Sequence, residues 1–88
     1  MTPFELTVWL PHDARFAPTM RELAMHAAQH AGCARAKAEA FGRAAEELLR
    51  RCLEETGPGD ALPVVMRRDA GPLELRIDDR TITLEINP

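Results

Sequence analysis

The stretch Leu73-Glu-Leu-Arg-Ile-Asp-Asp-Arg-Thr-Ile-Thr-Leu-Glu-Ile86 decides the fold. On both sides of its Asp-rich centre, apolar residues alternate with Glu, Arg, Asp or Thr. Alternation with a period of two is typical of a strand with one buried and one solvated face. Two such runs joined by a short turn predict a β-hairpin. One face of this hairpin therefore needs another layer of the chain to cover it.

Two upstream segments show the same alternation and predict two more strands. In residues 4–10 the apolar side is formed by Phe4, Leu6, Val8 and Leu10, and in residues 62–66 by Leu62, Val64 and Met66. The polar side of the first segment carries Glu5, Thr7 and Trp9. A Trp on an otherwise polar sheet face is a candidate anchor for a protein partner.

Two amphipathic helices are predicted between the first and second strands, over residues 16–31 and 34–55. Apolar residues recur there at spacings of three and four, which is the helical period. The predicted stripes are Phe16, Met20, Leu23, Ala27 and His30 or Ala31 in the first helix, and Ala38, Phe41, Ala45, Leu48, Leu49 and Cys52 in the second. Gly32 is placed to end the first helix, and Thr56-Gly-Pro-Gly-Asp60 is the strongest break in the chain.

The predicted order of elements is therefore β-α-α-β-β-β, in one domain over residues 1–88. Four strands with one polar face and two helices with one apolar stripe each favour an α+β fold, a two-layer α/β sandwich. We expect the helices to cover one face of the sheet only, which would leave Thr81, Thr83 and Glu85 exposed.

Composition excludes some function classes. Eleven Lys and Arg against fourteen Asp and Glu give a net charge of -3 over 88 residues, which argues against a nucleic-acid partner. The uncharged stretch at residues 23–33 belongs to a run that is too short for a membrane span, and the N-terminus has no signal-peptide pattern. We expect a cytoplasmic protein with no membrane contact, in which Cys33 and Cys52 are reduced thiols.

Motifs for catalysis or metal binding are weak. His26 and His30 are four residues apart on the first predicted helix and could share a metal, but the spacing supplies no third ligand, so packing is favoured. The chain has no GxSxG, GxGxxG or Walker motif. Along the second helix, Glu39, Arg43, Glu47 and Arg51 follow one another at intervals of four. The favoured interpretation of this pattern is a solvated face with ion pairs.

Three stretches carry a resemblance to a known family. They are Phe4-Glu-Leu-Thr-Val-Trp-Leu-Pro11; Ala31-Gly-Cys33 with Ala45-Glu-Glu-Leu-Leu-Arg-Arg-Cys-Leu53; and Val64-Val-Met-Arg-Arg-Asp-Ala-Gly-Pro-Leu-Glu-Leu-Arg-Ile-Asp-Asp79. In this order they resemble the first part of the anti-sigma-factor serine kinase domain, in the histidine-kinase-like ATPase superfamily that includes gyrase and MutL. The resemblance implies the first part of that ATPase fold.

The resemblance also implies where a nucleotide site would lie. Glu47 matches the family's Glu that acts as general base or water organiser, and Asp78 matches the aspartate that recognises adenine. Arg51 stands where the family has its magnesium-binding Asn, and a guanidinium has no lone pair for a metal. Arg80 and Ile82 stand at the family's glycine positions. Because the chain ends at Pro88, we also expect the glycine-rich lid to be missing, so phosphoryl transfer is not expected.

The sequence therefore predicts a truncated, degenerate domain that acts as a non-catalytic regulatory module and binds a protein. The resemblance to anti-sigma factors implies a role in transcription regulation, through partner-switching or two-component signalling. The partners that the resemblance implies are a sigma factor or a STAS-domain protein, and no cofactor is expected. Candidate partner-binding residues are Trp9, Arg43 and Arg50. One alternative is a nucleotide-binding domain or kinase that keeps weak ATP and Mg²⁺ binding through Glu47 and Asp78. Another is a structural domain that forms a homodimer through an exposed sheet edge.

Arg51 has two further interpretations if the nucleotide site is degenerate. Its guanidinium could pair with Glu47 one turn back, or with Asp78 across the former pocket, and so fill the space of the metal and phosphate. Alternatively, Arg51 points into solvent as an ordinary helix charge. Burial distinguishes these interpretations, because an exposed pair contributes little and a buried one is costly to break.

Overall fold

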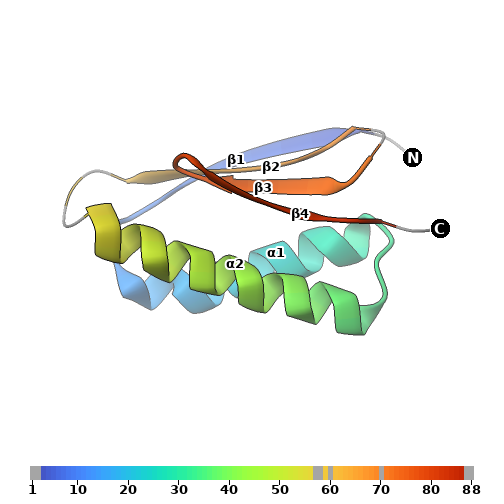
Figure 1. Cartoon of the computed structure of the whole chain (residues 1–88), viewed down its shortest axis with the longest axis horizontal. Helices are drawn as coiled ribbons and strands as arrows, with labels where there is room; N and C mark the ends of the chain where they lie inside the picture. The colour runs from blue at the N-terminus through green and yellow to red at the C-terminus, as the bar shows by residue number, and fades with distance from the viewer. Residues whose placement is uncertain (1–2, 57–58, 60, 70, 87–88) are drawn as a thin grey trace.

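Within residues 3–56, 59, 61–69 and 71–86, which the computed structural model describes, two helices lie on one face of a four-stranded antiparallel sheet (Figure 1). The spatial order of the strands is the chain order, β1-β2-β3-β4, so β1 and β4 are the two edges. The elements are β1 (Phe4–Leu10), the 3-10 helix η1 (Ala14–Phe16), α1 (Ala17–His30), α2 (Arg35–Thr56), β2 (Leu62–Arg68), β3 (Leu73–Ile77) and β4 (Arg80–Leu84).

This architecture confirms the predicted α+β sandwich and its β-α-α-β-β-β order. Thr81, Thr83 and Glu85 are exposed, which confirms that the helices cover one face of the sheet. The link to the histidine-kinase-like ATPase fold stays a prediction. Gly57, Pro58 and Asp60, in the predicted break, lie outside the described residues.

The strand register assigns each residue to one of two faces. Leu6 pairs with Met66, Met66 with Leu75, and Leu75 with Ile82, so these four side chains share the face that the helices cover, here called the inner face. The residues between them point to the opposite, outer face. The inner face supplies most of the fully buried large side chains, namely Val64, Met66, Leu73, Leu75 and Ile77.

The helix α2 packs as predicted, because all six residues of its stripe are buried. The stripe predicted for α1 is wrong in part. Its buried residues are Ala17, Met20, Ala24 and Ala28, whereas Leu23 and Ala27 are half-buried. Of the two alternatives for the last position, Ala31 is buried and His30 is exposed. The reason is close packing of α1 on α2: a Cβ atom on Gly42 would lie 2.8 Å from the carbonyl oxygen of Arg21. Alanines fit so narrow a space, and larger side chains are displaced to its margin.

The connection between the helices depends on Gly32, as predicted. Its φ of 105° lies in the left-handed region that favours glycine. The backbone N–H of Gly32 donates to the carbonyl of Gln29, and that of Cys33 donates to the carbonyl of Ala28. These bonds satisfy carbonyl groups that the end of α1 would otherwise leave without donors.

Neither described helix is both long and apolar enough to pass through a membrane.

Candidate functional site

The first candidate site is the pair Glu47 and Arg51 on α2. Arg51 Nε lies 3.3 Å from Glu47 Oε1, and the two side chains are 61% and 60% exposed. The pair borders a hollow of about 230 Å³ between α2 and β4, which Ala44, Leu48 and Ile82 also line. The pairing that the sequence predicted is therefore present, but it lies in solvent and does not fill a buried pocket.

Asp78 lies in the turn between β3 and β4. Its φ of 57° is the left-handed conformation, which Asp tolerates better than most residues. Its backbone N–H donates to the carbonyl of Pro63, while its side chain is exposed. Among the described residues, no ion pair joins Asp78 to Arg51.

Arg80, which the resemblance places at a glycine position, contacts the end of α2. Arg80 forms an ion pair with Glu55, near the end of α2. This pair links the start of β4 to the end of α2, and the segment that follows Asp78 forms the edge strand β4 by pairing with β3. The geometry provides two exposed ion pairs and an apolar edge at the positions where the resemblance implies a nucleotide.

Arg43 and Arg50 lie on the solvent side of the helix layer. Arg50 pairs with Glu46 at 3.0 Å, and Glu46 also lies 3.5 Å from Arg21 of α1. Arg43 borders a shallow hollow with residues of both helices. These contacts connect the two helices through surface charges.

Trp9, the remaining candidate, lies on the other side of the molecule. It points to the outer face of the sheet, opposite Pro63 of β2, and its side chain is 64% exposed. The structure therefore separates Trp9 from Arg43 and Arg50 by the thickness of both layers. A single compact partner surface cannot contain all three.

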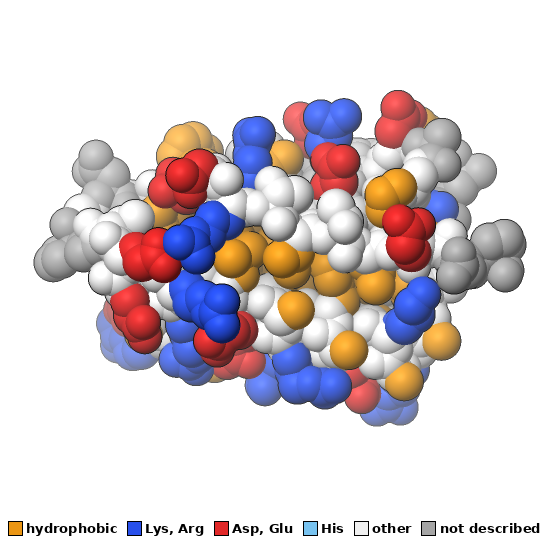
Figure 2. Space-filling view, viewed as in Figure 1, with side chains coloured by type: hydrophobic (Ala, Val, Ile, Leu, Met, Phe, Trp, Pro, Cys, Tyr) orange, Lys and Arg blue, Asp and Glu red, His pale blue; other side chains and the backbone are white. Residues whose placement is uncertain are grey.

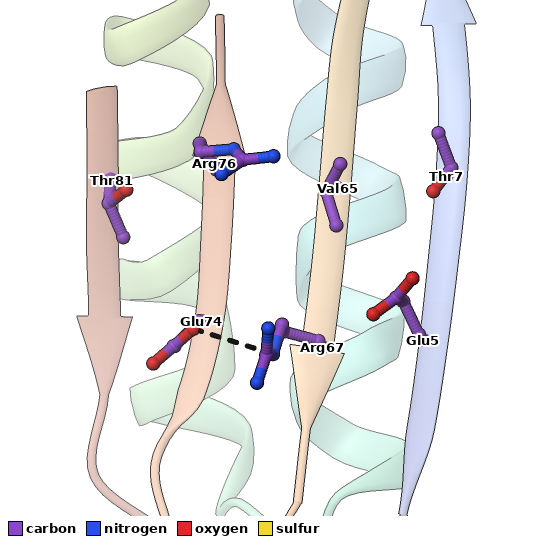
Figure 3. A pocket seen from close by; sticks show the side chains of 7 residues that line it. All are labelled: Glu5, Thr7, Val65, Arg67, Glu74, Arg76 and Thr81. Atoms are coloured by element: carbon purple, nitrogen blue, oxygen red, sulfur yellow. Dashed lines mark ion pairs between the residues drawn. The ribbon is translucent and has the colours of Figure 1, made fainter. Parts of the chain in front are cut away.

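The outer face also holds a hollow that the sequence did not reveal (Figure 3). It measures about 330 Å³ and crosses all four strands. Its lining is Glu5, Thr7, Val65, Arg67, Glu74, Arg76 and Thr81. These side chains point away from the helices, which lie behind the sheet in this view.

Charges in this hollow are only partly paired. Arg67 Nε lies 3.7 Å from Glu74 Oε2 on the neighbouring strand. Arg76 has no carboxylate within 4.0 Å among the described residues. Its guanidinium is therefore available to donate hydrogen bonds to a carboxylate of a partner.

The alternation of the strands is sufficient to place these side chains on the outer face, because each of them is adjacent in the chain to an apolar residue of the inner face. Bringing Arg67 opposite Glu74 requires the register between β2 and β3, which the sequence does not state. For this reason the sequence indicates Trp9 as a candidate but does not indicate the charged hollow on the same face.

The histidines and cysteines have separate surroundings. His26 lies 3.6 Å from a carboxylate oxygen of Glu22, and the His30 ring packs edge-on against Phe4, with ring centroids 6.0 Å apart. In the described part of the chain, His, Cys, Asp and Glu form no cluster of three or more that could hold a metal. Cys52 is a buried free thiol, and its burial raises its pKa.

Comparisons with models of protein families, with curated proteins and with solved structures found no match.

Proposed function

We propose that this chain is a non-catalytic regulatory module that binds a protein partner on the outer face of its sheet. The observation that carries the proposal is Trp9: a large aromatic side chain, 64% exposed, on a strand whose other face is anchored to the core through Leu10. Trp and Arg are the side chains that most often dominate the energy of a protein interface.

The surroundings of Trp9 fit such an interface. Trp9 stands opposite Pro63, and Val65 follows on the same face of β2. These three side chains offer an apolar centre, and the partly paired charges of Arg67, Glu74 and Arg76 adjoin it. An apolar centre bordered by polar groups is the usual anatomy of a protein interface. Because the strands hold the backbone, little conformational entropy is lost on binding.

The partner that this surface fits presents an apolar recess for the indole of Trp9 and a carboxylate for Arg76. The resemblance to anti-sigma factors supports a sigma factor or a STAS-domain protein as that partner, in a cytoplasmic signalling pathway. It supports binding over phosphoryl transfer because Arg51 replaces the residue that would hold magnesium.

Partner capture with matched variants tests the proposal. Immobilised wild-type protein, Trp9→Ala, Arg76→Glu and Arg43→Glu are each exposed to an extract of the native host, and retained proteins are identified by mass spectrometry. We expect one protein to be retained by the wild type and by Arg43→Glu but lost from both outer-face variants. Truncation of a central Trp costs about 2 kcal/mol or more of binding free energy, roughly a thirtyfold loss of affinity.

The Arg43→Glu variant is the control because it makes the same charge change as Arg76→Glu, on the helix side of the molecule. The proposal would be contradicted if both outer-face variants retained the partner and the Arg43→Glu variant lost it. It would instead locate partner binding on the helices. Circular dichroism of each variant verifies that the fold is intact.

A further inference from the structure

An apolar strip follows the groove between β4 and α2. Figure 2 shows it as orange side chains along this side of the molecule, with charged side chains above and below. Strand β4 contributes Ile82 and Leu84, and the segment after it contributes Ile86; all three are half-buried and packed against the core. The helix contributes Ala44, which borders a hollow with Ile82, and Ala40, one turn earlier on the same face, and both are exposed. Apolar atoms thus remain accessible on both walls of the groove.

The strand β4 also offers unpaired backbone groups along this groove. It is an edge of the sheet. Residues 78 and 79 form a two-residue turn, and Ile77 pairs with Arg80 across it. In such a hairpin the closing pair exchanges hydrogen bonds, and the bonded pairs then recur at every second residue. The backbone N–H and C=O of Thr81 and Thr83 therefore face outward, away from β3.

We propose that a second copy of this chain docks here, with the two β4 strands antiparallel about a two-fold axis near Thr83. The sheets then join into one continuous sheet, and the two α2 helices face each other across the same axis. This interface differs from the outer face proposed above for the partner.

The distances between layers favour this arrangement. Neighbouring strands lie about 4.8 Å apart, and α2 contacts both β3 and β4. The two-fold axis lies half a strand spacing outside β4, and the axis of α2 lies half a spacing inside it, beneath the space between β3 and β4. The helix axis and the two-fold axis are therefore about one strand spacing apart. The two α2 helices would then be about 10 Å apart, close to the 8–10 Å of packed helices. The small side chains of Ala40 and Ala44 suit so close an approach.

Charges along the groove are complementary under the same symmetry. Lys37 Nζ donates a hydrogen bond to the carbonyl of Glu85 at 3.0 Å, so Lys37 lies at the C-terminal end of β4. Glu47 borders the same hollow as Ile82, towards the other end, and its exposed carboxylate also pairs with Arg51. The two charges thus stand on opposite sides of the level of Thr83, and a two-fold axis there brings Lys37 of each copy towards Glu47 of the other.

This self-complementarity favours a second copy over a strand of another protein. A two-fold interface requires that the same patch match itself, residue by residue. The groove meets that requirement because the edge of β4 can pair antiparallel with its own copy, the alanines can pack against the same alanines, and Lys37 and Glu47 carry opposite charges. A strand from another protein would use the edge of β4 but would not need charges arranged symmetrically about Thr83.

Charge exchange tests the proposal by sedimentation equilibrium over a series from micromolar to millimolar protein. We expect the wild type to dimerise, and Lys37→Glu and Glu47→Lys each to raise the dissociation constant of the dimer about tenfold or more, since each places like charges together twice. An equimolar mixture of the two variants should restore dimers, because the mixed pair has opposite charges at both contacts. A monomeric wild type, or a mixture no more dimeric than its components, would overturn the proposal.

A backbone variant provides an independent readout. Thr83→Pro removes an outward N–H and places a ring at the edge, where proline is tolerated by the strand but blocks pairing. Thr83→Val keeps the N–H and is the matched control. We expect the Pro variant to be monomeric and the Val variant to dimerise like the wild type. Dimers of unchanged affinity in Thr83→Pro would show that the copies associate elsewhere, which would also overturn the proposal.

Discussion

The two faces of the sheet belong to the same strands but differ in what their side chains contact. On the inner face, Met66 and Leu75 are fully buried beneath the helices. On the outer face, Val65 and Arg76 of the same two strands border a hollow that is open to solvent. Neighbouring residues in the chain thus have different roles. The inner face stabilises the fold, and the outer face is available for a partner.

The largest difference between the faces is expected in stability. Leu75→Ala removes a fully buried side chain from the inner face, and we expect a loss of about 2–5 kcal/mol in the free energy of unfolding. Arg76→Ala, the next residue on the outer face, should change it by no more than about 0.5 kcal/mol. Urea denaturation of both variants measures the difference. Similar losses would show that the outer face is also part of the stabilising core.

A smaller effect is expected from the buried thiol beneath β3. Burial raises the pKa of Cys52 above its ordinary value of 9.0. The unfolded chain therefore releases this proton at a lower pH than the folded chain does. The contribution of Cys52 to the free energy of unfolding is fully present below the pKa that its thiol has in the unfolded chain. This contribution is lost as the pH rises from that value through the pKa of the thiol in the folded chain.

For wild-type protein in reducing buffer, the free energy of unfolding should therefore fall with increasing pH above about 9. In Cys52→Ala this fall should be shallower, because no thiol titrates at position 52. Denaturation curves at a series of pH values measure both slopes. Parallel pH profiles for the two proteins would show that the thiol does not contribute.

A still smaller effect is expected at the surface pair on α2. Arg51 and Glu47 are both exposed, so Arg51→Ala should change the free energy of unfolding by less than about 0.5 kcal/mol. Urea denaturation measures this change. A loss above about 1 kcal/mol would contradict the interpretation of Arg51 as an ordinary exposed helix charge.

No effect is expected from nucleotide. Because a guanidinium cannot ligate magnesium, ATP with Mg²⁺ should leave the melting temperature of the wild type unchanged. Thermal denaturation with and without nucleotide measures this. Binding at a hundredfold excess over the dissociation constant would add about 2.7 kcal/mol, so a clear rise in melting temperature would support the ATP-binding alternative.

Much of the fold could be predicted from the sequence, because alternation and helical spacing report which side of an element is buried. The four strands, the order of the elements and the buried stripe of α2 follow from those periods. The buried face of α1 could not be predicted in the same way. Leu23 and Ala24 are both apolar, and which of them is buried depends on how closely α1 packs against α2, as the contact of Gly42 with Arg21 shows.

Less of the candidate site could be predicted, since it depends on how separate elements are placed. The sequence identified Trp9, Arg43 and Arg50 as exposed binding candidates, but it could not show that the two-layer arrangement separates Trp9 from the arginines. It also predicted the pairing of Glu47 with Arg51 from their spacing. The exposure of that pair depends on how β4 lies against α2, which is a tertiary property.

Site-specific photo-crosslinking in cells of the native host tests most directly the claim that the outer face binds the partner. A benzophenone amino acid replaces Thr7, within the outer-face hollow, or Glu22, on the exposed side of α1. We predict that irradiation joins a protein partner to the chain labelled at position 7, and that adding Trp9→Ala abolishes this product. A partner joined at position 22 and not at position 7 would contradict the account.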